Sequence, residues 1–239
     1  MYLFDQTFAA PADNLACDEA LLAMCERGFG GGILRFWEPS THFVVLGYGS
    51  VAGDEVDLDA CRRLGVSIFR RSSGGGSVLQ GPGCMNYSLV LHTEESGPFA
   101  TITATTAHIM ARNAAALQPL VSAVITVRGT SDLTIDDVKF SGNAQRRLNR
   151  ALLFHGTILV DFDLSLIETV LRLPARQPAY RAHRPHRAFL RNVAIPRPAV
   201  REALRNAWTA LQDLPLVPLE EIRRLAHERY TLDSWTYRR

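Results

Sequence analysis

Short runs of β-forming residues gather in the middle of the sequence, and they do not alternate regularly with helical segments. Strand-like patterns are predicted at residues 33–37, 42–48, 66–71, 86–92, 122–128, 132–135, 138–145 and 151–160. Helical patterns are predicted from Pro11 to a stop at Gly28, and at residues 54–64, 100–117, 164–171, 199–211 and 219–229. Because a regular βαβ alternation is missing, these patterns predict an α+β fold, with a mainly antiparallel or mixed central sheet and helices packed against it.

Length and composition fit one large domain. The chain has 239 residues, of which 47% are hydrophobic, and this is ordinary for a protein that buries a core. No repeat, low-complexity tract or clean boundary divides the sequence. We therefore expect a single domain over residues 1–239, with a small helical tail at about 199–239.

Several classes of protein are disfavoured by composition. The net charge is only +2, so a broad nucleic-acid footprint is not expected. No apolar stretch reaches the roughly 20 residues that span a bilayer, and the first residues do not resemble a signal peptide. The four cysteines are scattered without the spacing of metal ligands, so no metal site is predicted. A reduced, cytoplasmic protein without nucleic-acid or membrane partners fits these features.

A glycine cluster directly follows one predicted strand. Three consecutive glycines, Gly74, Gly75 and Gly76, come soon after Arg70 and Arg71. Such glycines permit positive φ and close approach of the backbone to a bound molecule, and their N–H groups can form a concavity for an anion. The spacing matches neither a Walker A loop nor a dinucleotide-binding fingerprint. The cluster predicts either a clamp over a narrow ligand or a simple flexible connection between strands.

Lys139 is the only lysine among 26 lysine and arginine residues. An ammonium is a compact charge with three rotatable donors, whereas a guanidinium is a planar fork that stays protonated. A bias toward arginine codons explains why other lysines are missing, but it does not explain why this one is present. Ser141, Gly142 and Asn143 follow it closely. We expect Lys139 to be functional; the alternative is an ordinary surface charge.

Three segments together resemble a known family. They are Arg-Arg-x-x-Gly-Gly-Gly-x-Val at residues 70–78, Lys-Phe-Ser-Gly-Asn-Ala at 139–144 and Phe-His-Gly-Thr at 154–157. In this order and spacing they resemble the lipoate–protein ligases and the related octanoyl and lipoyl transferases. Residues 14–20 are similar to that family's first helix and residues 234–237 to its usual ending, so the resemblance covers nearly the whole chain.

The resemblance implies a fold like the catalytic domain of biotin ligases and class II aminoacyl-tRNA synthetases. It implies that ATP, with Mg²⁺, activates lipoate to lipoyl-AMP, and that the lipoyl group then passes to a lysine of a carrier domain. That carrier would be a 2-oxoacid dehydrogenase E2 or a protein like the H protein of glycine cleavage. Many ligases of this family have a C-terminal accessory domain. We expect none here, so a small accessory chain is a possible partner.

The resemblance also assigns residues to the site. Lys139 would touch the acyl carbonyl and the phosphate. The residues that would hold or line the acyl-adenylate are Arg70, Arg71, Gly74, Gly75, Gly76, Ser77, Val78, Ser141, Gly142, Asn143, His155 and Gly156. A buried, purely structural histidine is the alternative for His155.

One segment departs from the ligase pattern. Ligases of this family usually show His-Asp-x-Gly-Asn after the glycines, but this chain has Gln-Gly-Pro-Gly-Cys at residues 80–84. The Gly-Pro-Gly turn resembles the octanoyltransferase branch. Cys84 is therefore a possible nucleophile for ATP-independent octanoyl or lipoyl transfer, and a neutral packing residue is its alternative. Because Gln80 replaces the usual histidine, a non-catalytic homologue that binds a carrier or ligand is a third hypothesis.

Residues 172–198 are rich in proline, arginine and histidine and predict an extended or mobile loop. The arginines and histidines from Arg176 to Arg191 favour a solvated loop. Their functional alternative is an electropositive rim that attracts an acidic carrier domain.

Overall fold

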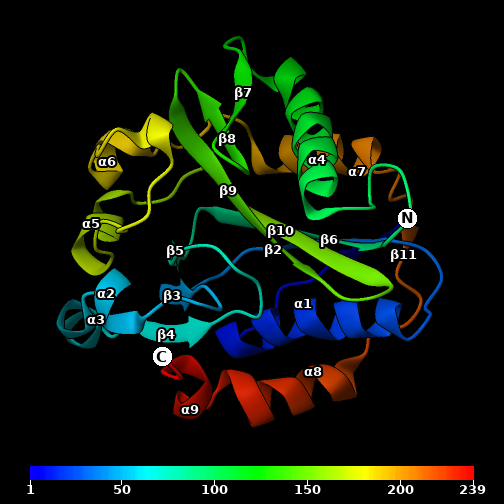
Figure 1. Ribbon diagram of the computed structural model, residues 1–239, viewed down its shortest axis with the longest axis horizontal. Coiled ribbons are helices and arrows are strands. Elements are labelled where there is room, and N and C mark those ends of the chain that lie inside the picture. The colour runs from blue at the N-terminus through cyan, green and yellow to red at the C-terminus, as the bar shows by residue number, and fades with distance from the viewer.

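A computed structural model describes residues 1–239 and contains a large sheet, a small sheet and helices on both faces of the large one (Figure 1). The strands are β1 (Tyr2–Asp5), β2 (Ile33–Trp37), β3 (Phe43–Leu46), β4 (Ser67–Arg70), β5 (Val78–Gln80), β6 (Cys84–His92), β7 (Ile125–Arg128), β8 (Asp132–Ile135), β9 (Val138–Arg147), β10 (Ala151–Leu159) and β11 (Gln212–Asp213). The α-helices are α1 (Pro11–Glu26), α2 (Ala52–Glu55), α3 (Leu58–Leu64), α4 (Ile102–Leu117), α5 (Ser165–Val170), α6 (His186–Phe189), α7 (Arg197–Ala207), α8 (Leu219–Leu225) and α9 (Asp233–Thr236).

The large sheet has eight strands in the order β11-β1-β2-β6-β10-β9-β8-β7. β1 pairs in parallel with β2 and β11, and the other neighbours are antiparallel. The small sheet has the order β4-β3-β5, with one parallel and one antiparallel pair. The predicted α+β fold with a mainly antiparallel, mixed sheet is therefore confirmed.

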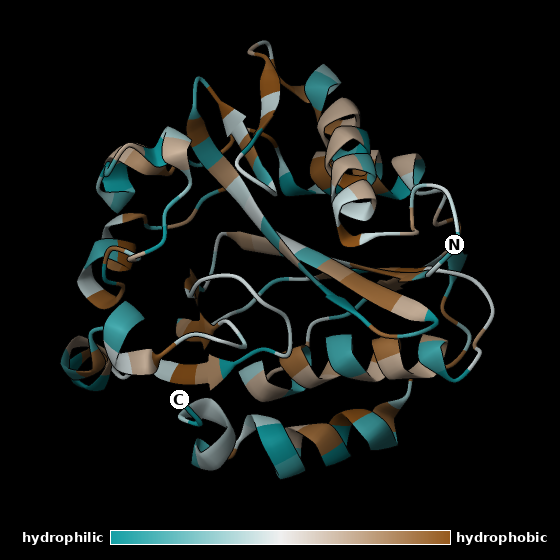
Figure 2. Cartoon of the chain, viewed as in Figure 1, coloured by the Kyte–Doolittle hydropathy of each residue, from teal (hydrophilic) through white to brown (hydrophobic).

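Helices cover both faces of the large sheet, which explains why its central strands are apolar on both sides. α1 and α8 lie below the sheet in Figure 1, and α4 and α7 lie above it. Along β10, Leu153 packs in the core between the sheet and α1, while Leu152 and Phe154 pack in the core between the sheet and the helices α4 and α7. Brown and teal alternate along α4 and α8 in Figure 2, as expected for helices with one buried face, whereas α1 is buried on nearly every side.

Most predicted elements are present, with shifts at their ends. The helix predicted at residues 54–64 is two short helices, α2 and α3, because Val56 between them is extended and bridges Leu171. β1, β11 and α9 were not predicted. The strands β1 and β11 are four and two residues long, so their periodicity carries little signal, and they form only through parallel pairing.

The segment at residues 172–191, called the strap below, differs from the predicted mobile loop. It contains a 3₁₀ turn at Ala179–Arg181 and the helix α6, and Arg191 N donates to Lys139 O at 2.9 Å. Within it Arg181, His186 and Phe189 are buried. The strap folds because its few apolar and stacking groups pack onto β9, which its polar composition does not reveal. Across the whole structure, no helix has the length and apolar character needed to cross a membrane.

Candidate active site

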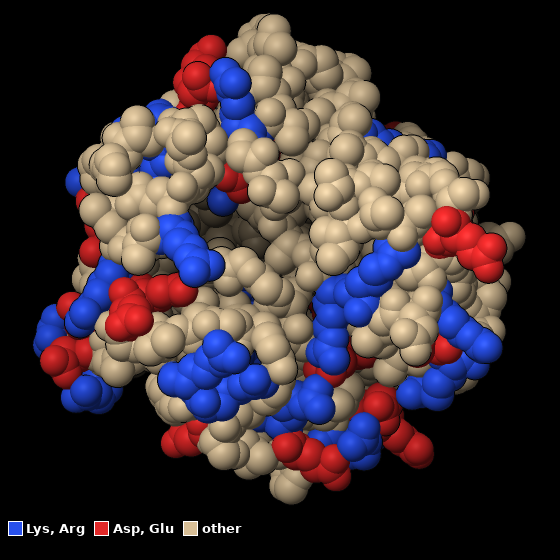
Figure 3. Space-filling model, viewed as in Figure 1, with Lys and Arg blue, Asp and Glu red and all other residues tan.

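A pocket of about 310 Å³ lies between the large sheet, the small sheet and the strap. Its mouth is visible as a hollow in Figure 3, with blue side chains beside it. The residues predicted for the site that line this pocket are Arg71, Gly75, Gly76, Ser77, Val78, Lys139, Ser141, Gly142, Asn143, His155 and Gly156. Three segments far apart in the sequence thus meet at one cavity. Arg70, Gly74 and Cys84 do not line it.

Sheet register forms the floor of the pocket. Asn86 on β6 lies opposite Trp37 on β2 and Thr157 on β10. Thr157 in turn lies opposite Gly142 on β9, which pairs with Asp132 on β8. Because directly opposed residues of paired strands face the same side, these five positions form one row across the sheet, and all five line the pocket.

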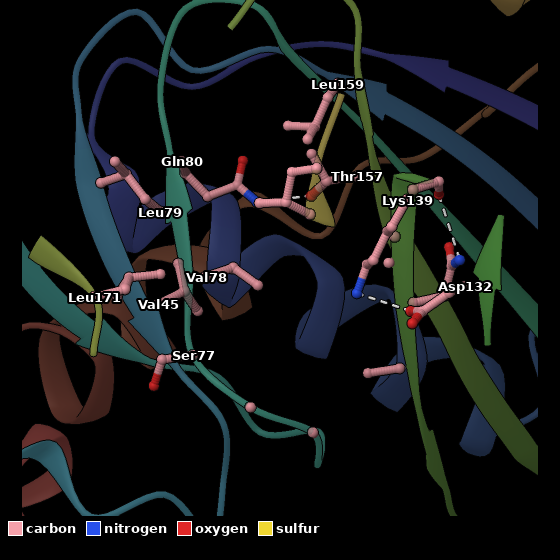
Figure 4. A pocket seen from close by; sticks show the side chains of 18 of the residues that line it. Val45, Ser77, Val78, Leu79, Gln80, Asp132, Lys139, Thr157, Leu159 and Leu171 are labelled. Carbon is pink, nitrogen blue, oxygen red and sulfur yellow. Dashed lines mark hydrogen bonds and ion pairs between the residues drawn. The ribbon is translucent and has the colours of Figure 1, made fainter. Parts of the chain in front are cut away.

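The ammonium of Lys139 lies above this row. Lys139 Nζ is 2.7 Å from Asp132 Oδ1, and the two side chains are 24% and 13% exposed (Figure 4). A register shift between Leu133 and Thr134 leaves Lys139 on the pocket side, opposite Thr134. A Cβ at Gly142 would lie 2.6 Å from Lys139 Nζ. A side chain at position 142 would therefore displace the end of the lysine from its present position beside Asp132.

A second carboxylate orients His155. Asp18 on α1 accepts from Arg35 at 2.7 Å and contacts His155 Nδ1 at 3.0 Å, while His155 Nε2 is 2.6 Å from Ser73 Oγ. Burial alone would raise the pKa of Asp18, but Arg35 and His155 outweigh burial, and the pKa is lowered. His155 thus lines the pocket with both ring nitrogens engaged. Through Ser73 it holds the glycine loop, defined here as residues 70–78.

Arg71 and Glu55 shape the glycine loop. Arg71 Nη2 donates to Gly74 O at 2.5 Å and to Gly76 O at 2.9 Å, and burial lowers the pKa of Arg71 to about 10. The carboxylate of Glu55 accepts from both the backbone N and the Oγ of Ser77 at 2.7 Å. The glycine loop is therefore fixed from two sides and is not a simple flexible connection.

Arg70 is not a pocket residue, contrary to the prediction. Successive side chains of a strand point to opposite faces, so Arg70 points away when Arg71 points in. Arg70 is 0% exposed; its Nη1 donates to Gly47 O and Ser50 O at 2.7 Å, and its Nε donates to Thr236 O at 2.9 Å. Arg70 thus fastens α9 beneath the glycine loop. Gly74 likewise contributes only its carbonyl, as the acceptor for Arg71.

Cys84 is also outside the pocket. Its side chain is 0% exposed, packs with Val44 and Leu46, and has a pKa raised to about 12 by burial. A thiol in such surroundings stays protonated and is a poor nucleophile. The geometry therefore favours a packing role for Cys84. The other three cysteines are buried too, and none of the four lines the pocket.

Asn143 and Gly156 form a partly buried junction at the edge of the pocket. A Cβ at Gly156 would lie 1.7 Å from Asn143 Oδ1, so the glycine makes room for the amide. Asn143 Oδ1 accepts from Tyr87 OH at 2.6 Å, and Tyr87 OH accepts from Asn113 at 2.9 Å. Asn113 Oδ1 in turn accepts from Trp208 Nε1 at 2.7 Å. This chain of hydrogen bonds fixes the amide by linking it to α4 and to the end of α7.

Gln80, where the ligase pattern has histidine, takes part in a closed ring of hydrogen bonds. Gln80 Nε2 donates to Thr157 Oγ1 at 2.7 Å (Figure 4). Thr157 Oγ1 donates to Asn86 Oδ1 at 2.6 Å, and Asn86 Nδ2 donates to Gln80 Oε1 at 2.9 Å. All three residues line the pocket. Their polar groups satisfy one another, so this wall is neutral.

Sequence reasoning missed several pocket residues, among them Asp18, Trp37, Glu55, Gln80 as a wall residue, Asp132, Arg181 and His186. Asp132 had a usable signal, because a tight connection at residues 136–137 pairs its strand with the strand that contains Lys139. Arg181 and His186 were assigned to a solvated loop. That assignment is wrong for both, because they are 4% and 8% exposed.

Comparison with solved structures identifies the class of protein. A bipartite lipoate protein ligase from Thermoplasma acidophilum, studied with its E2 lipoyl domain, has a TM-score of 0.84 and 25% identity, over 99% of this chain and 95% of that one. A lipoate-protein ligase A bound with ATP has the same fold, with a TM-score of 0.82 and 24% identity, over 99% and 98% of the two chains.

The chain belongs to the lipoyl protein ligase A/B catalytic domain family, whose profile matches residues 10–202. The octanoyltransferase LipM of Lysinibacillus sphaericus is 26% identical over 100% of this chain and 99% of its own length. Subunit 1 of the Thermoplasma acidophilum lipoate-protein ligase A is 31% identical over 67% of this chain and 63% of its own length. The predicted family is confirmed, and the protein is an enzyme of the lipoate ligase and octanoyltransferase family.

Proposed function

We propose that the protein is an ATP-dependent lipoate–protein ligase, which forms lipoyl-AMP and transfers the lipoyl group to a lysine of a carrier domain. One observation carries this proposal: the pocket contains the only lysine ammonium of the chain and no cysteine. A transfer through a thioester needs a thiol within reach of the acyl group, whereas a mixed anhydride needs a fixed positive charge.

Lys139 would act in both steps. In the first, a carboxylate oxygen of lipoate attacks the α-phosphorus of ATP and pyrophosphate leaves. In the second, the carrier amine attacks the acyl carbonyl and AMP leaves. Negative charge grows on oxygen in each transition state. An ammonium about 4 Å away, at an effective dielectric constant near 20, attracts such a charge by about 4 kcal/mol. If half of that attraction acts only in the transition state, the rate rises roughly 30-fold.

The other residues that line the pocket suit lipoate and ATP. Apolar side chains suit an aliphatic acyl chain; they include Leu15, Trp37, Val45, Leu79 and Leu159. Five cationic and three carboxylate side chains also line the pocket, which suits a nucleotide triphosphate. The chain holds no cluster of three side chains able to bind a metal ion, so Mg²⁺ fits here only as the companion of ATP phosphates.

The carrier would be a lipoyl domain of a 2-oxoacid dehydrogenase E2 or a protein like the H protein of glycine cleavage. The similarity to a ligase studied with its E2 lipoyl domain supports this choice. A separate accessory chain would join the reaction if the protein alone proves inactive.

Octanoyl transfer without ATP is the second candidate, because several full-length relatives are named octanoyltransferases. The burial of Cys84 argues against that cysteine as the acyl carrier. Intact-mass analysis after incubation with octanoyl acyl-carrier protein checks this candidate, since an acyl adduct that disappears in Cys84→Ser would support it.

Lipoate-dependent exchange of pyrophosphate into ATP tests the ligase proposal. We expect exchange by the wild type and at least tenfold slower exchange by Lys139→Ala, with Lys139→Arg intermediate. Absence of exchange in the wild type, with or without an added accessory chain, would refute the proposal. Unchanged lipoylation of the carrier by Lys139→Ala would instead favour a binding homologue that does not catalyse.

A further inference from the structure

The positive charges in the pocket are unequally compensated. Of the five cationic side chains, Lys139 alone forms an ion pair, with Asp132. Arg71 uses its donors on carbonyl groups of the glycine loop. The other three, Arg172, Arg176 and Arg181, all belong to the strap, and none has a carboxylate within ion-pair distance. The strap thus brings three guanidinium groups without an ion-pair partner to the cavity.

Arg181 is the most informative of the three because it is only 4% exposed. Its Nε donates to Arg184 O at 3.1 Å, its Nη2 contacts His186 Nδ1 at 3.3 Å, and its guanidinium lies 4.5 Å from the Phe189 ring centroid. No partner is found for Nη1. Burying a charge without an opposite charge is costly, so buried charges are normally paired. An anionic ligand would supply the missing partner.

His186 holds Arg181 in place as a neutral ring. A guanidinium can only donate, so Nδ1 of His186 accepts from it, and Nε2–H donates to Arg172 O at 3.3 Å. Burial, followed by the charge of Arg181, lowers the pKa of His186 and keeps the ring uncharged. His186 therefore links the guanidinium of Arg181 to the backbone of Arg172. This link fixes the position of the guanidinium before a ligand binds.

The strap is also fastened to the carboxylate that holds Lys139. Tyr180 OH donates to Asp132 Oδ2 at 2.7 Å, while Asp132 Oδ1 contacts Lys139 Nζ at 2.7 Å. Tyr180, the neighbour of Arg181 in the sequence, is thus linked to the ammonium of Lys139 through Asp132. An anion bound by Arg181 would therefore lie on the Lys139 side of the pocket, and not at its apolar wall.

We propose that Arg181, with Arg172 and Arg176, binds the β- and γ-phosphates of ATP and the pyrophosphate that leaves. This inference rests on the proposed function. Arginine forks match phosphate oxygens bidentately, and three of them offset the charge that collects on the leaving group when the bond from the α-phosphorus to the bridging oxygen breaks. Pyrophosphate departs before the carrier reacts, so these three arginines act in adenylate formation and not in transfer to the carrier.

The test compares the two half-reactions in Arg181→Gln. Charge-assisted hydrogen bonds contribute about 1.5–3 kcal/mol, so we expect formation of lipoyl-AMP from ATP to fall about 10- to 100-fold. Inhibition by pyrophosphate should weaken by a similar factor. Transfer from chemically prepared lipoyl-AMP to the carrier should stay within about twofold of wild type. Equal losses in both half-reactions, or unchanged pyrophosphate inhibition, would overturn the inference.

Arg187→Gln is the matched control, because Arg187 is an exposed strap arginine that does not line the pocket. It removes the same charge and should leave pyrophosphate inhibition unchanged. Arg181→Lys guards against a folding defect and should restore part of the binding. Calorimetry with inorganic pyrophosphate separates this inference from the proposed function. A wild type that binds pyrophosphate through Arg181 but forms no adenylate would keep the subsite and refute the ligase proposal.

Discussion

The glycine loop and the strap both contain arginines beside the pocket, but the two segments use them differently. In the glycine loop, Arg70 and Arg71 give most of their donors to backbone carbonyls and fix the shape of the loop. In the strap, Arg172 and Arg176 have no side-chain partner, and Arg181 has only a carbonyl and a neutral histidine. An arginine surrounded by carbonyl acceptors fixes the backbone around the site, whereas one without such acceptors keeps its donors free for a ligand. Neighbouring acceptors, more than burial, separate the two uses.

Arg70→Ala should show the largest effect, a loss of stability. A stable Arg70→Ala variant would contradict the comparison between the two segments. The change leaves carbonyls of Gly47, Ser50 and Thr236 without their donor in a buried place. Each unsatisfied group costs about 1–3 kcal/mol, so we expect a loss of at least about 3 kcal/mol in the free energy of unfolding. Arg172→Ala in the strap should stay within about 0.5 kcal/mol of wild type. Urea denaturation of both variants measures the difference.

Gly142→Ala should mainly affect catalysis. The added Cβ would lie 2.6 Å from Lys139 Nζ and would push the ammonium from its position. A misplaced catalytic group loses about 10- to 100-fold in rate, and we expect that loss in pyrophosphate exchange, with little change in unfolding. Gly53→Ala is a fitting control, since no atom lies within 4 Å of its added Cβ. A fully active Gly142→Ala enzyme would contradict the placement of Lys139.

Tyr180→Phe should have a smaller effect and tests whether the strap is coupled to Lys139. The change removes one hydrogen bond to Asp132, and such a bond contributes about 0.5–1.5 kcal/mol. Because Lys139 acts in both steps, we expect adenylate formation and transfer from lipoyl-AMP both to slow about three- to tenfold. An unaltered rate would mean that the strap and Lys139 act independently.

His186 should give the smallest effect, seen as a pH dependence of stability. Burial and the nearby Arg181 and Lys139 lower its pKa, while the carbonyl of Arg172 and Glu168 partly oppose them. The unfolded state therefore takes up a proton first as the pH falls below about 6.5, and stability declines there. His186→Gln should flatten the dependence of the urea midpoint on pH between about 6.5 and 5. An identical slope in both proteins would show that another group is responsible.

The sequence contained the motifs of the site but not the direction of every side chain. Lys139 and the glycines were found because they stand out in the sequence, and His155 was assigned to the site through the family resemblance. Arg70 was assigned to the wrong side, although the two-residue period of a strand separates it from Arg71. The contact between Asp18 and His155 joins residues 137 positions apart and depends on how α1 packs on the sheet. The burial of Arg181 was hidden because a segment rich in arginine and proline looks solvated.

The contact between Lys139 and Asp132 also holds the only ε-amino group of the chain where its chemical modification can report whether the pocket is filled. Amine-reactive acylating reagents can modify one ε-amino group in the whole chain, and the side chain that carries it lines the cavity. Any compound that fills the cavity should shield it, and peptide mass mapping would distinguish it from the α-amino group. A single mass tag thus yields a binding curve for ATP, lipoate or an inhibitor without any engineered label.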